Sequence, residues 1–339
     1  MRLTSPPELH SPEQQVEAYL RNVMSQVSAP TSPAGGESGD VDELAQQIFD
    51  LVTSREFCHL SRTRTAPYRE ETMVLLRRRI ESGGPFRFFY DIGPGYHATT
   101  RPGVTGLRFD VGLSELLILF QLASLSRRIS ELYPPAAHFW LVIDNLCGLR
   151  TNDIPVERTA AYADQLRELI RESGLDDRVE LIVESEEFEL EEYDRLLAAH
   201  ELQPLTTPST EAHENVERFL GRRCSIDEAA ERIERYRRTT NVTDYLLTRL
   251  VSGVHMTQRA TVATIGFRPF PGGDSRAQCG EVALAHNSKG KLRPVLLTSR
   301  NVGSYDLTRL RFPELLPSTV EYVTYAEQTA AEPTAQSRR

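Results

Sequence analysis

Three short apolar runs, each followed by a helical pattern, constrain the fold of this chain more than any other feature. The runs are "FRFFYDI" at 86–92, "HFWLVID" at 138–144 and "RVELIVES" at 178–185. The second is a continuous apolar run that ends in an acidic residue, which is typical of a buried parallel strand. The alternation of strand and helix predicts an α/β fold, with a mainly parallel Rossmann-like sheet flanked by helices.

Helical patterns fill the intervals between these runs. The longest, at 113–135, has an apolar stripe, Ser114 as its expected cap and Pro134-Pro135 as its stop. Another begins on Pro155 and ends at Gly174, because proline suits the first turn of a helix and glycine its end. Further helices are predicted at 42–54, 69–84 and 187–200.

Composition divides the chain into four parts. Residues 1–40 contain the Ser/Pro/Gly-rich "SAPTSPAGGESGD", so we expect a mostly disordered segment with at most a short helix in "EQQVEAYLRNVM". The Rossmann-like domain is predicted at 41–205, and "PLTTPST" at 204–210 is a linker. Residues 206–325 are predicted to be helical at first and β-rich from Arg259 onward. The strands of this part either extend the first sheet or pack against it. A disordered tail is expected at 326–339.

Charge and hydropathy narrow the class of partner. The 339 residues carry a net charge of −9, which disfavours nucleic acid and anionic membranes. No window has the roughly 18 consecutive apolar residues of a membrane helix, and the amino terminus lacks a basic-then-apolar signal pattern. We therefore expect a cytoplasmic protein that binds small molecules, with no nucleic-acid or membrane partner. Its oligomeric state does not follow from the sequence.

Cysteine, histidine and lysine usage limits the available chemistry. The four cysteines lie far apart, and neither C-x-x-C nor H-E-x-x-H occurs, so no disulfide framework or zinc site is expected. We expect a protein that needs no metal ion and no other cofactor. The cysteines are Cys58, Cys147, Cys224 and Cys279.

The lysines limit the possible nucleophiles. The only two are Lys289 and Lys291, so any lysine nucleophile must be one of them.

The loop after the first apolar run spells the G-x-G-x-x-A of a dinucleotide-binding turn, from Gly93 to Ala98. Such a turn needs its third small residue in the first turn of a helix, because that helix terminus binds the pyrophosphate. Here Ala98 is followed by "TTRPG", and the next helical pattern begins only near Ser114. The sequence therefore disfavours nicotinamide binding.

The same loop still carries polar residues at the expected carboxyl edge of the sheet, where open α/β sheets bind ligands. A long loop in a compact domain is itself typical of a functional segment. The alternative is a connector whose charges lie in water, and the loop alone does not decide between the two. Its polar residues include Asp91, Tyr96, His97, Arg101, Arg108 and Asp110.

Four features follow one another between residues 70 and 170. A helix opens with Glu115, "YPP" forms a corner at 133–135, a strand run ends on Asp144, and Tyr162 follows on the next helix. In this order they resemble the isonitrile (isocyanide) synthases of the pyoverdine/dityrosine biosynthesis family. A weaker similarity to the family pattern is found in the β-rich region at 260–300.

The chain departs from the family pattern at three places. The family's F-P-x-K-S-P-N loop is "IGPGYHATT" here, so the loop lysine is absent, and the strand-end S-D-G is Ile143-Asp144-Asn145. The R-L-S-I-H stretch of the second half appears as "IGFRPFP", where Arg268 is matched only loosely. His286 and Lys289, on a hairpin-like loop, replace the missing lysine only if the fold brings that loop over the first one.

The resemblance implies an enzyme that turns an α-amino group into an isonitrile, with the carbon drawn from a pentulose phosphate. Such chemistry needs a neutral amine beside a ketone, acid/base groups, and cations for phosphate and carboxylate. The expected catalytic groups are His97, Glu115 and Asp144, the last favoured by its position at a strand's carboxyl end. Tyr162 is expected to pack in the core. Substrate contacts are expected from Tyr96, Arg101, Arg108, Asp110, Arg268, His286 and Lys289.

Two alternatives to the family reaction stay open. The same fold can carry another carbon–nitrogen bond-forming or bond-cleaving reaction, because the loop lysine is gone. From a different class, the chain can be a non-catalytic module that binds a small molecule. His97, Glu115 and Asp144 gathered around one pocket would favour the enzyme, whereas scattered side chains would favour the module.

Overall fold

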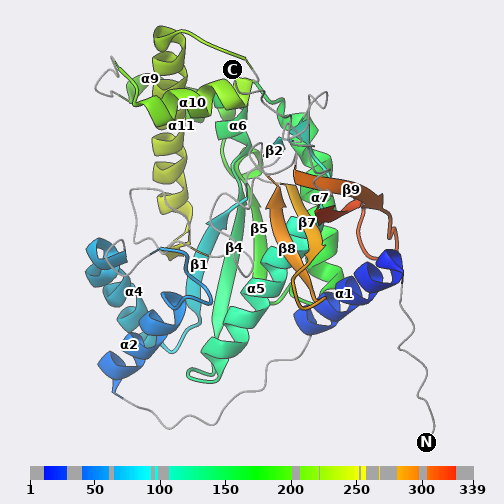
Figure 1. The fold of residues 1–339 in the computed structure, drawn as a ribbon. Coiled ribbons are helices and arrows are strands. Elements are labelled where there is room, and N and C mark those ends of the chain that lie inside the picture. The colour runs from blue at the N-terminus through cyan, green and yellow to red at the C-terminus, as the bar shows by residue number, and fades with distance from the viewer. Residues whose placement is uncertain are drawn as a thin grey trace, which may run out of the picture.

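The central sheet of the computed structural model is parallel, with the strand order β5-β4-β1-β6 (Figure 1). The three apolar runs of the sequence are adjacent strands, so the predicted Rossmann-like α/β fold is confirmed. The strands are β1 (Phe86–Asp91), β4 (Ala137–Ile143), β5 (Val179–Val183) and β6 (Val254–His255). The structure describes residues 11–28, 40–60, 65–92, 96–97, 107–200, 207–220, 222–251, 253–256, 267, 281–297 and 304–325.

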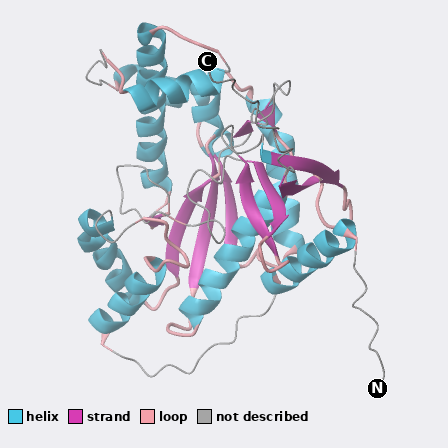
Figure 2. Cartoon of the chain, viewed as in Figure 1, coloured by secondary structure: helices cyan, strands magenta, loops and turns pink. Residues whose placement is uncertain are grey.

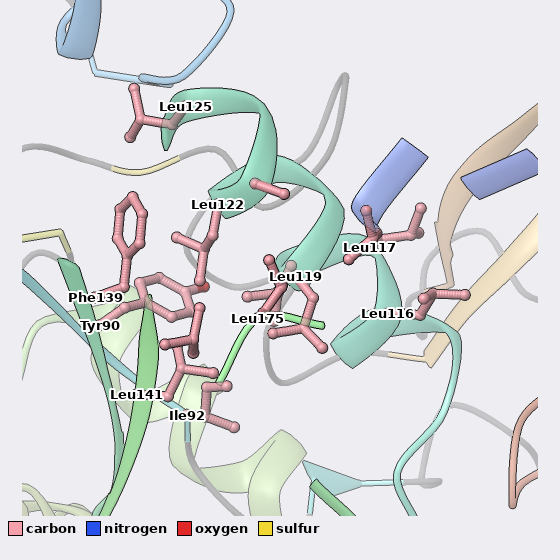
Figure 3. Packing of buried hydrophobic residues seen from close by; sticks show 14 of the residues in the cluster. Tyr90, Ile92, Leu116, Leu117, Leu119, Leu122, Leu125, Phe139, Leu141 and Leu175 are labelled. Carbon is pink, nitrogen blue, oxygen red and sulfur yellow. The ribbon is translucent and has the colours of Figure 1, made fainter. Parts of the chain in front are cut away.

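One face of the sheet is covered by α5, whose apolar stripe is almost wholly buried. Figure 3 shows Leu122 of α5 beside Tyr90 of β1 and Phe139 of β4. Each such leucine contributes about 1.5–3 kcal/mol through the apolar area it removes from water. The helices that pack into this core include α2 (Val41–Val52), α4 (Arg69–Ser82), α5 (Leu113–Ser130) and α7 (Val156–Glu172). The short η1 (Ala66–Tyr68) leads into α4.

The opposite face of the sheet is covered by α11, which packs Leu247 on Phe89 and Val142. It is a continuous helix of 25 residues in the part of the chain that the sequence predicts to be helical. No proline or glycine interrupts it. The helices on this side are α6 (Asn145–Asn152), α8 (Glu184–Glu187), α9 (Leu190–Ala199), α10 (Thr210–Leu220) and α11 (Ile226–Leu250). Among the helices in the described ranges, none combines the length and apolar character needed to cross a membrane.

A second, mixed sheet follows in the sequence, with the order β8-β7-β10-β9. Its strands are among those drawn in magenta in Figure 2. Its inner residues, among them Leu284 and Tyr322, join the same apolar cluster as α5 and the first sheet. The predicted β-rich part is therefore present, and it shares one core with the Rossmann-like part. The strands are β7 (Glu281–His286), β8 (Leu292–Leu297), β9 (Tyr305–Leu310) and β10 (Val320–Tyr325).

Most helix boundaries follow their expected signals. Pro155 precedes α7, and Gly174, with a φ of +64°, lies just beyond its end. Ser114 is not the cap of α5, because Gly112 occupies that position and the carboxylate of Glu115 accepts its N–H. The sequence does not predict α6, since Gly148 weakens its helical pattern. The strand expected around 259–270 lies outside the described residues, apart from Phe267.

The amino-terminal segment contains α1 (Pro12–Val27), so the short helix that the sequence allowed within residues 13–24 is present and extends to Val27. Ser11 and Gln14 form a reciprocal capping box at its start. The helix places a buried stripe against α5, and this stripe belongs to the main core. Local composition did not predict that this helix docks on the core, because flanking Ser, Pro and Gly dominate the segment while the stripe is stabilised only by distant partners. The buried residues are Val16, Leu20, Val23 and Val27.

We predict that α1 is required for stability. Leu20→Ala should lower the free energy of unfolding by about 2–5 kcal/mol, because it leaves a cavity between α1 and the core. Asn22→Ala, on the exposed side of the same helix, should change it by less than about 0.5 kcal/mol. Urea unfolding followed by circular dichroism measures both. Equal stability of the two variants would contradict the docking of α1.

Candidate active site at the carboxyl edge of the sheet

Acidic residues end three adjacent parallel strands at one edge of the central sheet. Asp91 is the last residue of β1, Asp144 follows β4 and Glu184 follows β5. Their side chains are buried, with 1%, 7% and 0% of their surface exposed. Burying a carboxylate is costly unless hydrogen bonds or charges stabilise it. Three of them at the ligand-binding edge of an α/β sheet therefore mark the candidate site.

Asp144 occupies the cap position at the start of α6, directly after β4. Its backbone carbonyl accepts the first hydrogen bond of the helix, from Gly148 N at 2.9 Å. The positive end of the helix dipole favours a negative charge at this position. The structure thus places the strongest sequence candidate at the predicted edge, at the start of a helix.

Glu184, which follows the neighbouring strand β5, accepts hydrogen bonds from the start of α6. Its Oε2 accepts hydrogen bonds from the backbone N–H groups of Leu146, at 3.0 Å, and Cys147, at 3.1 Å. Sequence reasoning missed Glu184, although it follows an apolar run in the same way as Asp144. The signal that could have found it is therefore the one that selected Asp144.

Asn145 adds a second tie between the ends of β4 and β5. Its Nδ2 donates to Ser185 Oγ at 2.8 Å and to Thr159 Oγ1 at 3.1 Å, while its Oδ1 accepts from Ser185 N at 3.0 Å. The side-chain amide therefore joins α6, α7 and α8. Asp144 is consequently presented by a fixed backbone.

Hydroxyl-bearing side chains, among them Tyr193 and Thr243, lie on the α11 side of this edge. The phenol of Tyr193 is fully buried, donates to the Thr239 carbonyl at 3.1 Å and lies 3.1 Å from Thr243 Oγ1. Burial raises the pKa of Tyr193 far above its usual range, and the nearby Cys147, Glu184 and Asp144 raise it further. Tyr193 therefore remains protonated and acts as a neutral donor.

Glu115 and Tyr162, which the family resemblance singled out separately, contact each other. The Tyr162 hydroxyl donates to Glu115 Oε1 at 3.1 Å, and Oε2 accepts from Gly112 N at 2.8 Å and Ser114 Oγ at 2.9 Å. Tyr162 also packs in the main core, as expected. Glu115 is therefore an oriented carboxylate at the start of α5, which begins at the carboxyl edge because it follows β1 in the chain.

The carboxyl-terminal sheet approaches this helix start. A Cβ added at Gly112 would lie 2.5 Å from Ser318 Oγ, so only glycine fits there without displacing the Ser318 side chain. Ser318 is buried just before β10. The second sheet thus closes one side of the region around Glu115.

The loop between β1 and α5 contains a short antiparallel ribbon, formed by β2 (Tyr96–His97) and β3 (Leu107–Arg108). His97 is paired with Leu107 and Tyr96 with Arg108. Residues 96–97 are extended, whereas Ala98, where a dinucleotide-type helix would begin, lies outside the described residues. Asp110 is exposed, between β3 and α5. The side chains of Tyr96, His97 and Arg108, and all of Arg101 and Arg268, lie outside the described residues.

His286 and Lys289 lie elsewhere in the fold. The ring of His286 contacts Tyr322 Oη at 2.9 Å and Gln15 Oε1 of α1 at 2.7 Å. Lys289 is exposed in the turn between β7 and β8. Figure 1 shows this turn next to α1, away from the end where β4 stops. The structure therefore does not bring these two residues to Asp144, and they do not replace the missing loop lysine there.

Comparison with solved structures relates this fold to that of a known protein. No family model matches the chain, and no curated protein matches its sequence. The fold is similar to that of the PvcA protein from Pseudomonas aeruginosa, with a TM-score of 0.58. The similarity covers 82% of this chain and 99% of the PvcA chain, at 17% sequence identity. This chain therefore has a PvcA-like fold over most of its length.

We predict that Glu184 stabilises the edge through α6. Glu184→Ala removes the acceptor of two buried N–H groups and should lower the free energy of unfolding by about 1–3 kcal/mol. Glu184→Gln keeps one oxygen acceptor and should cost less. The control is Glu187→Ala, an exposed position on the same short helix, which should leave urea unfolding unchanged. Indistinguishable curves for Glu184→Ala and the control would contradict this role.

Proposed function

We propose that this chain is a PvcA-like biosynthetic enzyme of secondary metabolism that acts on the amino group of an amino acid or a related amine. The observation that carries the proposal is the buried, oriented carboxylates at the carboxyl edge of a PvcA-like fold. The sequence resemblance over residues 70–170 supports it, because it points to the pyoverdine/isonitrile synthase family from the order of motifs.

Asp144 and Glu115 have distinct parts in the proposed reaction. Asp144, at the end of β4, holds the substrate amine and accepts its proton, so that a neutral nitrogen can attack a ketone. Glu115, fixed by three hydrogen-bond donors, supplies a steady negative charge near the imine that follows. These are the two predicted catalytic residues whose side chains the structure describes.

The ribbon loop supplies the remaining groups of the proposal. His97 exchanges protons near neutral pH, and Arg101 and Arg108 bind the anionic groups of an amino acid or sugar phosphate. The antiparallel pairing of β2 with β3 supports this arrangement, because it sets His97 opposite Leu107, next to Arg108. His286 and Lys289 take no part, because both lie near α1.

The family reaction is the leading form of this proposal, with a pentulose phosphate as the carbon donor. Absence of the loop lysine favours a variant in which the same edge carries another carbon–nitrogen reaction. A binding module without catalysis is the alternative from a different class. The purified chain, incubated with amino acids and a pentulose phosphate, distinguishes them by mass spectrometry of the products. Isonitrile formation supports the family reaction, and ligand binding without any product supports the module.

We predict that Asp144→Asn abolishes most of the turnover. The amide keeps the shape of the side chain but cannot accept the amine proton, so the rate of product formation should fall by roughly a hundredfold or more. The matched control is Asp153→Asn at the other end of α6, where the backbone φ of +54° tolerates asparagine. The control should retain the wild-type rate. Equal rates for both variants would remove Asp144 from the mechanism.

We predict different kinetic effects for two residues of the ribbon loop. His97→Ala should lower kcat by roughly a hundredfold with little change in KM, because a proton-transfer group is lost. Arg101→Ala should instead raise KM for the anionic substrate, because a charge-assisted hydrogen bond is lost. Steady-state kinetics of both variants measures this split. Wild-type kinetics in both would mean that the loop is only a connector.

A further inference from the structure

A cluster of metal-ligating side chains lies where α10 meets α11, outside the site described above. His213 and Glu217 are separated by one helical turn of α10, so they lie on the same face. Cys224 returns to that face because it ends the turn between the two helices, immediately before the α11 cap Ser225. Figure 1 shows α10 and α11 side by side at one end of the molecule.

The ligand atoms of this cluster are already close. One atom from each of His213, Glu217 and Cys224 lies within 4.8 Å of the other two. His213 Nε2 is 3.8 Å from Glu217 Oε1. In a tetrahedral zinc site with bonds of about 2.0–2.3 Å, neighbouring ligand atoms are roughly 3.3–3.8 Å apart. The cluster therefore needs a closure of only about 1 Å to match that geometry.

Hydrogen bonds from the turn hold two of the three groups in place. Cys224 N donates to Glu217 Oε1 at 3.2 Å, and Arg223 Nη1 donates to Glu217 Oε2 at 2.7 Å. The ring of His213 is fixed by a 3.0 Å contact between its Nε2 and the Cys224 carbonyl. Partners of this kind orient ligands in metal sites. Only the His213 contact must be given up for Nε2 to bind an ion.

We propose that His213, Glu217 and Cys224 form a binding site for a zinc-class divalent metal ion, with a water molecule as the fourth ligand. The thiolate and imidazole suit zinc or cobalt, whereas magnesium and calcium prefer sites made only of oxygen atoms. The thiol proton of Cys224 leaves to solvent when the metal–sulfur bond forms. The sequence alone does not predict this site, because its H-x3-E-x6-C spacing matches no standard zinc motif.

The position of the cluster indicates a structural ion. Ser225 caps α11, and Thr239, which contacts Tyr193 at the carboxyl edge, lies 14 residues further along the helix. At 1.5 Å per residue the two are roughly 21 Å apart. An ion at His213 would thus fasten α10 to α11 and would not take part in the proposed reaction. The competing account is that the hydrogen bonds alone close this turn.

The proposal can be tested by measuring cobalt binding to the full chain. The protein is first freed of metal with a chelator, and its cysteines are kept reduced with a phosphine. One equivalent of Co²⁺ should produce thiolate-to-cobalt absorption in the near ultraviolet and the visible bands of tetrahedral cobalt, and Zn²⁺ should displace both. Cys224→Ser should lose the thiolate absorption. His213→Ala and Glu217→Gln should each weaken the affinity at least about tenfold. Glu214→Gln, the same change on the same helix outside the cluster, should stay within about twofold of wild type.

Two results would overturn the proposal. The first is no thiolate absorption at one equivalent of Co²⁺. The second is absorption that persists unchanged in Cys224→Ser, since another cysteine would then bind the ion. Circular dichroism of each variant confirms that loss of binding is not loss of the fold. Neither result bears on the proposed function, whose readout is product formation.

Discussion

The parallel pairing of β4 with β1 and β5 is the constraint on which the rest of the structure depends. β4 is central, so both of its faces must be apolar, and α5 and α11 cover them. Because all three strands run the same way, the helices that follow them begin at one edge. Asp144 and Glu115 are therefore brought to that edge by the backbone, although 29 positions separate them in the sequence.

The same pairing explains why so many buried carboxylates are tolerated at this edge. Glu184 accepts N–H groups at the start of α6, and Glu115 does so at the start of α5. Each replaces hydration with donors that a helix start leaves unpaired. These two carboxylates stabilise the framework. Asp144, which follows β4 at the same edge, is the residue to which we assign the substrate amine.

The PvcA-like fold and the chemistry of the site are separate questions. One fold can support many reactions, because function depends on the residues placed at its site. The family's loop lysine is absent here, and the two lysines of the chain lie near α1, in and beside the β7–β8 turn. The carboxyl edge must therefore work with carboxylates, hydroxyls and the groups of the ribbon loop. This difference makes the choice of substrate the main question for experiment.

The sequence by itself determined the α/β class, the three central strands and the location of Asp144, because these depend on local periodicity and on short-range signals such as Pro155 and Gly174. Only the tertiary structure decided the docking of α1, the pairing of Tyr162 with Glu115 and the position of His286 against Gln15. Each of these contacts joins residues that are far apart in the sequence. The shortest separation, 47 positions, is the one between Glu115 and Tyr162. A local pattern carries no information about such partners, since their contacts form only when distant elements pack into one core.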